Sequence, residues 1–112
     1  MEVRVKLQFS KGKESQFGQA NFLEVLLSAL GGCIGVYANK YLERHAIAFT
    51  KLEIMVTGEL TTESPARIVD IKVKVDTDAQ LGDKKEVFLR FIHNCPVHNT
   101  LLNTKEVEID LL

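Results

Sequence analysis

The sequence predicts a single α+β domain over residues 1–112, built from a central core helix, a second helical region and antiparallel strands. Two patterns predict this class. Residues 20–44 are apolar without strand-like alternation, whereas four other segments alternate between apolar and polar side chains, as half-buried strands do. The composition, with 46% hydrophobic and 26% charged residues, is that of a folded globular protein.

The alternating segments are predicted to be strands over residues 3–9, 52–60, 69–75 and 107–111. Residues 10–13 are expected to form a turn after the first of them. Pro65 lies in the connection 61–67, which suits the loop of a hairpin. In the last segment Val107, Ile109 and Leu111 alternate with acidic residues, so we expect a strand at the end of the chain.

The central helix is expected to span about residues 20–44 and to be buried nearly all round, because almost no polar face remains. Its apolar run is interrupted at Ser28, Gly31, Gly32, Cys33 and Gly35. It therefore lacks the ~20 uninterrupted apolar residues of a membrane span. Each glycine costs roughly 1 kcal/mol of helix propensity relative to alanine, so we expect close packing around them.

A second helical region follows the strands. Asp83 is predicted to cap a helix that ends near Asn94, with Glu86 completing a capping box. Its inner face is expected to consist of Val87, Phe88, Phe91 and Ile92. Pro96 suits the first position of another short helix, residues 97–102, which makes Cys95 the N-cap.

Charge and length limit the classes of partner. Fourteen Lys and Arg residues against fifteen Asp and Glu give a net charge of −1, so no global field recruits nucleic acid or a membrane surface. Two cysteines and an N-terminus without an apolar export segment predict a cytoplasmic protein. A chain this short buries only about two thirds of its unfolded surface, so we expect self-association.

The two cysteines lie in different settings. Cys33 is midway along the apolar helix, where a thiol is normally inert. Cys95 is predicted at a helix N-terminus, where backbone N–H groups and the helix dipole favour the thiolate. From the residues alone, Cys95 is therefore the more reactive thiol. The competing interpretation is that both are small buried hydrophobic residues.

Other polar residues suggest less specific chemistry. His93, Cys95 and His98 are spaced as metal ligands can be, but no second Cys/His pair accompanies them, so we expect no metal and no cofactor. The competing interpretation places both histidines at ordinary polar helix positions. His45 follows the central helix and is expected to contact its last carbonyl groups.

Glu24 is the only carboxylate in the first turns of the apolar helix and suits the positive end of its dipole. It lies nine residues before Cys33, about 13 Å along the axis and on the opposite side of an ideal helix. Glu24 is thus expected to orient another group, such as an arginine, rather than to touch the thiol. The pattern does not choose among Arg4, Arg44, Arg67 and Arg90.

Two segments together resemble a known family. Residues 24–33, EVLLSALGGC, resemble the E-L-L-L-A-A-L-G-G-C helix of the OsmC-like and organic hydroperoxide resistance proteins, and residues 95–101, CPVHNTL, resemble that family's C-P-V-x-x-x-L element. The separation of 62 positions between the cysteines also fits. The resemblance covers about residues 20–112.

This resemblance implies an OsmC-like fold, with a central buried helix and a second helix flanked by antiparallel β-sheets, in an intertwined homodimer. It further implies a cysteine-based thiol peroxidase that acts on organic hydroperoxides in the response to oxidative stress and is recycled by an external dithiol reductant. Cys33 then corresponds to the peroxidatic cysteine, Cys95 to the resolving cysteine and Glu24 to the glutamate that pairs with a catalytic arginine. The alternative is a noncatalytic dimer of the same fold that senses redox state or binds a small ligand.

Overall fold

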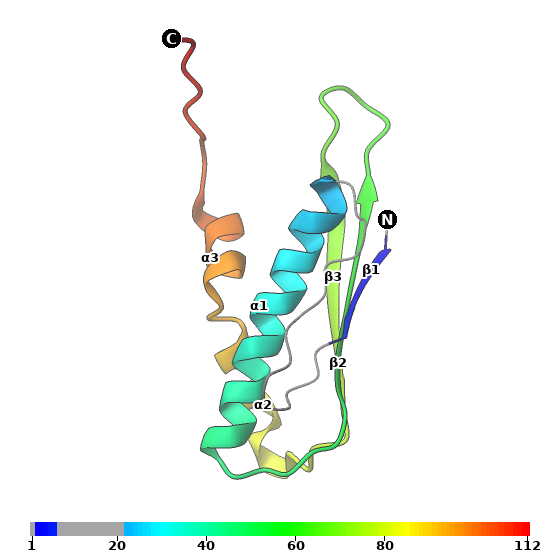
Figure 1. The fold of residues 1–112 in the computed structure, drawn as a ribbon, viewed down its shortest axis with the longest axis vertical. Coiled ribbons are helices and arrows are strands. Elements are labelled where there is room, and N and C mark those ends of the chain that lie inside the picture. Colours follow the sequence, from blue (N-terminus) through cyan, green and yellow to red (C-terminus); the bar gives the residue numbers. More distant parts are fainter. Residues whose placement is uncertain (1, 7–21) are drawn as a thin grey trace.

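The computed structural model describes residues 2–6 and 22–112 (Figure 1). In chain order its elements are β1 (Glu2–Lys6), α1 (Phe22–Arg44), β2 (Leu52–Leu60), β3 (Ile68–Thr77), the 3-10 turn η1 (Gly82–Lys84), α2 (Lys85–Ile92) and α3 (Pro96–Asn103). The predicted turn at residues 10–13, the end of the first predicted strand and the start of the central helix lie outside the described residues. The described part is an α+β fold, as predicted.

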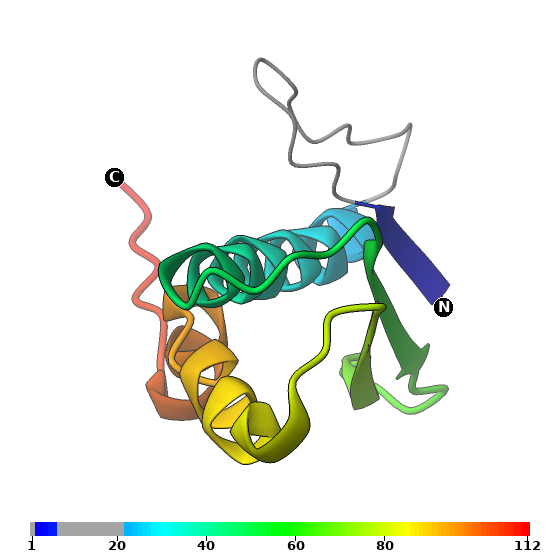
Figure 2. The same cartoon turned by 90° about the horizontal axis from the view of Figure 1, so that it is seen from below.

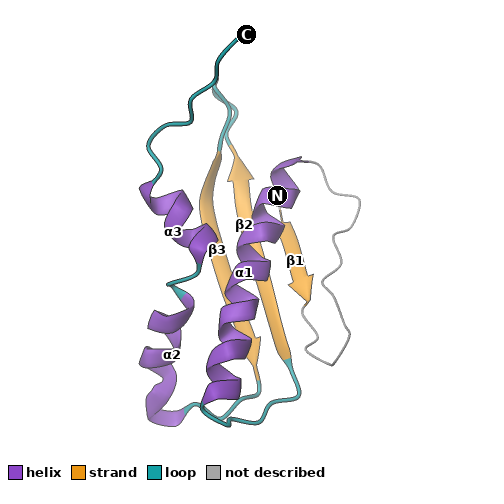
Figure 3. Cartoon of the chain, turned by 60° about the vertical axis from the view of Figure 1, so that its left-hand side comes forward, coloured by secondary structure: helices purple, strands orange, loops and turns teal. Residues whose placement is uncertain are grey.

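The strands form one antiparallel sheet in the order β1-β2-β3 (Figure 3). The inward positions of β2 are Leu52, Ile54, Val56 and Gly58, which are all buried. Ile54 pairs with Val75 on β3, so the apolar positions of both strands lie on the same side of the sheet. The loop between them closes where the Thr61 N–H donates to the Arg67 carbonyl over 3.0 Å, confirming the predicted hairpin.

Helix α1 packs on β2 with one part of its surface and on α2 and α3 with another (Figure 2). The buried side chains from these elements form one core cluster: Leu27, Leu30, Ile34, Ala38, Tyr41, Leu42, Leu52, Ile54, Val56, Phe88, Ile92 and Cys95. On α1 they recur every three or four residues, as expected for one helix face. The core therefore lies between α1 and the two layers that contact it.

The expectation of a helix buried nearly all round is wrong for the single chain. Val25, Leu26 and Val36 are each 41% exposed. Gly31 and Gly35 are buried, but a Cβ added at Gly32 would meet no atom within 4 Å, so close packing does not explain that glycine here. The apolar surface of α1 exceeds what the described part of one chain covers.

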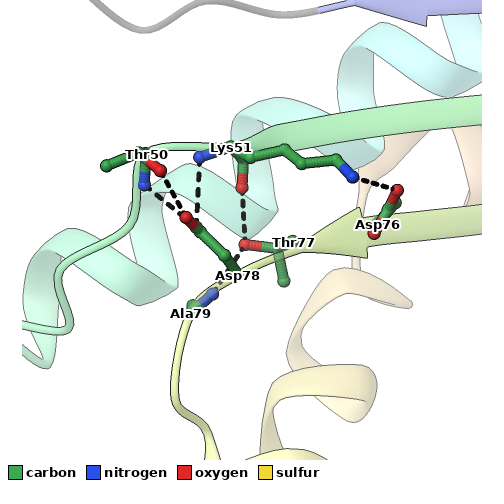
Figure 4. Close-up of polar contacts among 6 residues, drawn as sticks. All are labelled: Thr50, Lys51, Asp76, Thr77, Asp78 and Ala79. Carbon is green, nitrogen blue, oxygen red and sulfur yellow. Dashed lines mark hydrogen bonds and ion pairs between the residues drawn. The ribbon is translucent and has the colours of Figure 1, made fainter.

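A polar cluster fixes the start of β2 against the end of β3 (Figure 4). The Asp78 carboxylate accepts hydrogen bonds from the backbone N–H groups of Thr50 and Lys51, over 2.9 and 3.1 Å, and from the Thr50 hydroxyl. Thr77 donates from its hydroxyl to the Lys51 carbonyl over 2.7 Å. These bonds hold the end of the hairpin opposite its loop.

The second helical region differs from its prediction at the start. Lys84 is the N-cap of α2 and makes no side-chain cap bond, so the expected capping box of Asp83 and Glu86 does not form. The 3-10 turn η1 precedes the helix and provides its entry instead. Phe88 and Ile92 are buried as expected, but Val87 is 47% exposed.

The predicted C-terminal strand is also absent from the described chain. Residues 104–112 follow α3 without strand pairing and extend away from the body of the fold (Figure 1). Val107, Ile109 and Leu111 are 75%, 90% and 101% exposed. Alternation alone does not make a strand, because a strand needs an edge to pair with.

Candidate functional site

The fold brings the two cysteines together although 62 positions separate them in the sequence. Cys33 lies midway along α1 and is half-buried, whereas Cys95 precedes α3 and is fully buried. The two thiols lie close enough to interact, and the Cys33 thiol is one of the groups that raise the pKa of Cys95. The site is thus a pair of free thiols between α1 and the start of α3.

The local sequence explains how Cys95 is held. It has extended backbone angles, φ −64° and ψ 137°, and is followed by Pro96 in the first turn of α3, as predicted. The Cys95 Sγ accepts a hydrogen bond from the His98 backbone N–H over 3.3 Å. Cys95 is therefore the N-cap of α3, and this hydrogen bond holds its sulfur at the N-terminal end of the helix.

The predicted reactivity of Cys95 is wrong. Burial, together with the neighbouring Cys33, raises the pKa of its thiol to about 11. The hydrogen bond from the His98 backbone N–H lowers this pKa, but by less than burial raises it. Removal from water disfavours the charged thiolate more than the helix N-terminus stabilises it. Cys95 is accordingly a protonated thiol at neutral pH.

A partly apolar pocket of ≈ 330 Å³ lies among α1, β3, α2 and α3, and neither cysteine is among the residues that line it. Its wall includes Ile34, the residue after Cys33, and His98, whose backbone N–H contacts the Cys95 sulfur. The rest of the wall comes from β3 and α2: Ile71, Val73, Val75, Leu89, Ile92 and His93. Sequence reasoning missed this pocket, because only tertiary packing brings the inward positions of β3 together with residues of α2 and α3.

The two histidines near Cys95 contact backbone carbonyl groups. His93 Nδ1 lies 2.5 Å from the Leu89 carbonyl oxygen, and His98 Nδ1 lies 3.0 Å from the His93 carbonyl oxygen. Their rings meet edge to face, with centroids 5.4 Å apart. Among the described residues, no three His, Cys, Asp or Glu side chains gather as metal ligands would.

Three other sequence candidates, Glu24, Arg44 and His45, lie at or just beyond the ends of α1, whereas Cys33 is midway along it. Glu24 is in the first turn of α1, at the positive end of the helix dipole. Arg44 is in the last turn of α1, eleven residues beyond Cys33, and its guanidinium lies 5.9 Å from the centre of the Phe91 ring. His45 Nδ1 lies 2.9 Å from the Tyr41 carbonyl oxygen, which confirms the expected contact with the helix end.

Helix α1 is long and apolar enough to cross a membrane by length and composition alone, with a mean hydropathy of 1.2 over its most apolar window. Half of that window is buried inside the chain, and one such helix is weak evidence for a membrane span. Packing within the described chain thus accounts for only part of the apolar character of this helix.

Comparison with known proteins identifies the fold. Residues 2–110 match the family described as OsmC-like protein. The crystal structure of an OsmC-like hydroperoxide resistance protein from Jannaschia sp. CCS1 superposes with a TM-score of 0.69, over 88% of this chain and 71% of that one, at 12% sequence identity. No curated protein matches. The match extends over nearly the whole chain, including both cysteine segments, and so the chain belongs to the OsmC-like protein family.

Proposed function

We propose that this protein is a cysteine-based thiol peroxidase that reduces organic hydroperoxides. The observation that supports this proposal most directly is the contact between the Cys33 and Cys95 side chains. Two thiols in contact are what a peroxidase needs to convert a sulfenic acid into a disulfide without a large movement. Family membership and the hydroperoxide resistance protein of the same fold support a role in peroxide chemistry.

The first step oxidises Cys33. Its thiolate sulfur attacks the terminal oxygen of the hydroperoxide, the O–O bond breaks, and the alkoxide leaves with a proton as an alcohol. In the second step the Cys95 sulfur attacks the sulfenic acid at Cys33. An S–S bond forms, the S–O bond breaks, and hydroxide takes the Cys95 proton to leave as water. An external dithiol then reduces the disulfide and restores both thiols.

The exposure of the two thiols and the pKa of Cys95 support the proposal that Cys33 reacts first and Cys95 second. Cys33 is half-buried and can be reached from solvent, whereas Cys95 is fully buried. The pKa of about 11 keeps Cys95 protonated at neutral pH, so it does not compete for the peroxide. Its proton is then available to the hydroxide that leaves Cys33 in the second step. These properties favour a resolving role for Cys95.

The pocket supports a substrate with an alkyl group. Most of its wall is apolar, contributed by Ile34, Leu89, Ile92 and the inward residues of β3. An apolar wall favours binding of an organic hydroperoxide over hydrogen peroxide. Covering an alkyl chain with apolar side chains is favourable, whereas hydrogen peroxide has no alkyl chain and needs hydrogen-bond partners at both ends. In this proposal the alkyl group would occupy this pocket, and the peroxide would react at Cys33, the residue before the wall residue Ile34.

Glu24 has a positioning role in this proposal. It would hold an arginine whose guanidinium stabilises the Cys33 thiolate, since a neighbouring cation favours the charged form of a thiol. The arginine is left open among Arg4, Arg44, Arg67 and Arg90. A Glu24→Gln change is expected to lower the rate of Cys33 oxidation while leaving the Cys33–Cys95 disulfide able to form.

We also propose that the protein is a cytoplasmic homodimer. Val25, Leu26 and Val36 form an exposed apolar face on α1 in the single chain. A second copy of α1 packed on this face would remove the apolar surface from water, worth roughly 25 cal/mol per Å². The open space beside Gly32 lets another helix approach this side of α1.

The direct test is consumption of cumene hydroperoxide or tert-butyl hydroperoxide in the presence of a dithiol. Wild type is expected to turn over repeatedly, and Cys33→Ser is expected to be inactive. Cys95→Ser should consume about one equivalent and retain a sulfenic acid that dimedone traps. A wild type that consumes neither hydroperoxide would refute the peroxidase proposal and favour the noncatalytic dimer instead.

A further inference from the structure

The turn that carries Cys95 to the thiol pair is short. Residues 93–95 alone join α2 to α3 (Figure 3). The Asn94 N–H donates to the Phe91 carbonyl over 3.1 Å. The Cys95 N–H donates to the Ile92 carbonyl over 3.4 Å. Both bonds run back into the last turn of α2, so they hold the turn on that side and leave the direction of α3 to other contacts.

Helix α3 is weakly anchored by the packing of its own side chains. Its eight residues include no buried side chain. Val97 packs against the core, whereas Leu101 and Leu102 are 42% and 67% exposed. Burial of apolar surface on α3 therefore contributes little to the position of this helix. Polar contacts at its N-terminal end provide the more directional restraint.

The His98 side chain makes one of these contacts, and it joins α3 to α2. Its Nδ1 lies 3.0 Å from the His93 carbonyl oxygen. Because a carbonyl group only accepts, Nδ1 carries the proton and donates it. His93 is the C-cap of α2, and the last carbonyl groups of a helix have no donor within the helix. The His98 ring thus pairs with a carbonyl group that α2 itself does not pair.

The main chain of the same residue holds the resolving sulfur. The His98 N–H donates to the Cys95 Sγ over 3.3 Å. Asn99 closes the turn from the next position, because its N–H and its side-chain amide both donate to the Cys95 carbonyl, over 3.1 and 3.3 Å. His98 therefore contacts the end of α2 through its ring and the Cys95 sulfur through its backbone.

We propose that His98 is a positioning residue for the thiol pair, whose ring holds the first turn of α3 against the end of α2. This role rests on the resolving function of Cys95 proposed above. Without the ring contact the first turn of α3 can shift relative to α2, and the Cys95 sulfur then spends less time within bonding distance of Cys33. The chemistry of each thiol is unchanged, but their encounter becomes less frequent.

His93 offers a matched comparison within the same site. Its Nδ1 lies 2.5 Å from the Leu89 carbonyl oxygen, four residues back along the chain. Both histidine rings line the pocket, and they meet edge to face. The His93 contact stays at the end of α2, whereas the His98 contact joins two helices. A difference between equivalent substitutions at the two positions therefore reports the bridge, and the loss of an imidazole from the pocket is common to both.

The juxtaposition of the two sulfurs can be measured without peroxide. In a glutathione redox buffer the two thiols give two electrons and two protons to glutathione disulfide. Its S–S bond breaks, the Cys33–Cys95 bond forms, and two glutathione thiols are released. The equilibrium constant, measured by mass spectrometry after acid quenching and alkylation, gives the effective concentration of one thiol at the other. It therefore reports how well the fold holds the two sulfurs together.

Three substitutions separate the bridge from the ring. His98→Phe keeps a ring without a donor and should lower this equilibrium constant at least fivefold. His98→Asn, whose side-chain amide can donate in place of Nδ1–H, should stay within twofold of wild type. His93→Phe is the matched control and should also stay within twofold. Thermal unfolding of the reduced variants checks that each is folded, and His98→Leu replaces His98→Phe if the larger ring prevents folding.

Three results would overturn the proposal. An unchanged constant in His98→Phe would mean that burial of Cys95 alone positions its sulfur. Equal losses in His98→Phe and His93→Phe would mean that the rings act only through the packing of the pocket. A loss in His98→Asn as large as that in His98→Phe would contradict a role for the donated hydrogen bond.

The kinetics of the proposed peroxidase provide a second readout. After one equivalent of cumene hydroperoxide, dimedone trapping at successive times gives the lifetime of the Cys33 sulfenic acid. This lifetime should be at least fivefold longer in His98→Phe than in His93→Phe, and equal lifetimes would refute the positioning role. If Cys33 is not oxidised in wild type, the peroxidase proposal fails, while the glutathione equilibrium still decides the role of His98.

Discussion

At the scale of single residues, two effects compete at Cys95. Its N-cap position favours the thiolate, and the sequence made this effect visible through Pro96. Its burial was not visible, because Ile92 and the core side chains of α1 surround it only in the folded chain. Burial prevails and raises the pKa of the Cys95 thiol to about 11. The position of Cys95 at a helix N-terminus predicted a favoured thiolate, but its burial in the folded chain favours the protonated thiol.

This reversal predicts the titration of Cys95. In Cys33→Ser, thiolate absorbance near 240 nm should show a midpoint well above the ordinary value of 9.0. Since the folded pKa is raised, Cys95 contributes stability below pH 9 that is lost as the pH rises from 9 towards 11. The free energy of unfolding of wild type should fall more steeply in that range than that of Cys95→Ala. A midpoint at or below 9.0 would refute the burial argument.

At the scale of elements, the sequence predicted what local patterns determine. The β2–β3 hairpin and the N-cap of α3 were predicted because alternation, Pro65 and Pro96 encode them locally. Features that depend on contacts between distant parts of the chain could not be predicted correctly from local patterns. These are the pairing of the C-terminal segment, the extent to which α1 is buried, and the pocket. The capping box at Asp83 failed because a 3-10 turn, another local solution, begins the helix.

The polar cluster at the hairpin end predicts unequal effects of two similar substitutions. Asp78→Asn should lower the melting temperature more than Asp76→Asn, because Asp78 accepts hydrogen bonds from two backbone N–H groups and Asp76 pairs with an exposed lysine. The Thr50 hydroxyl lowers the pKa of Asp78, so its stabilisation is present near neutral pH and lost on acidification. Thermal unfolding at pH 7 and pH 3 measures both effects, and equal losses at pH 7 would contradict this role.

The core of the sheet gives a second prediction at this scale. Ile54→Ala should reduce the free energy of unfolding by about 2–5 kcal/mol, because Ile54 is fully buried between β2 and α1. Met55→Ala, on the other face of the same strand, is the matched control and should cost less. Urea unfolding measures the two values, and a larger loss at Met55 would mean that the assigned inner face of the sheet is wrong.

At the scale of the whole molecule, the described chain leaves apolar surface that an isolated globule would cover. The exposed face of α1 and the exposed apolar residues of the C-terminal segment occur together in a chain of 112 residues. Small chains gain more from association than large ones, because they bury less of their own surface.

The exposed face of α1 predicts the effect of a charge within it. Val36→Asp should weaken self-association at least tenfold, because a carboxylate would be buried between two helices without a partner. Val87→Asp is the matched control, since Val87 is similarly exposed but lies on α2. Analytical ultracentrifugation across a range of concentrations measures both. Equal effects of the two substitutions would place the interface elsewhere.

The central claim is that Cys33 and Cys95 act as one redox couple. The most direct measurement is intact-protein and peptide mass spectrometry after one equivalent of cumene hydroperoxide is added to the fully reduced protein. We predict a loss of two hydrogen atoms per chain and a single linked peptide pair that joins Cys33 to Cys95. Unchanged thiols, or oxidation of Cys95 while Cys33 stays reduced, would contradict the account.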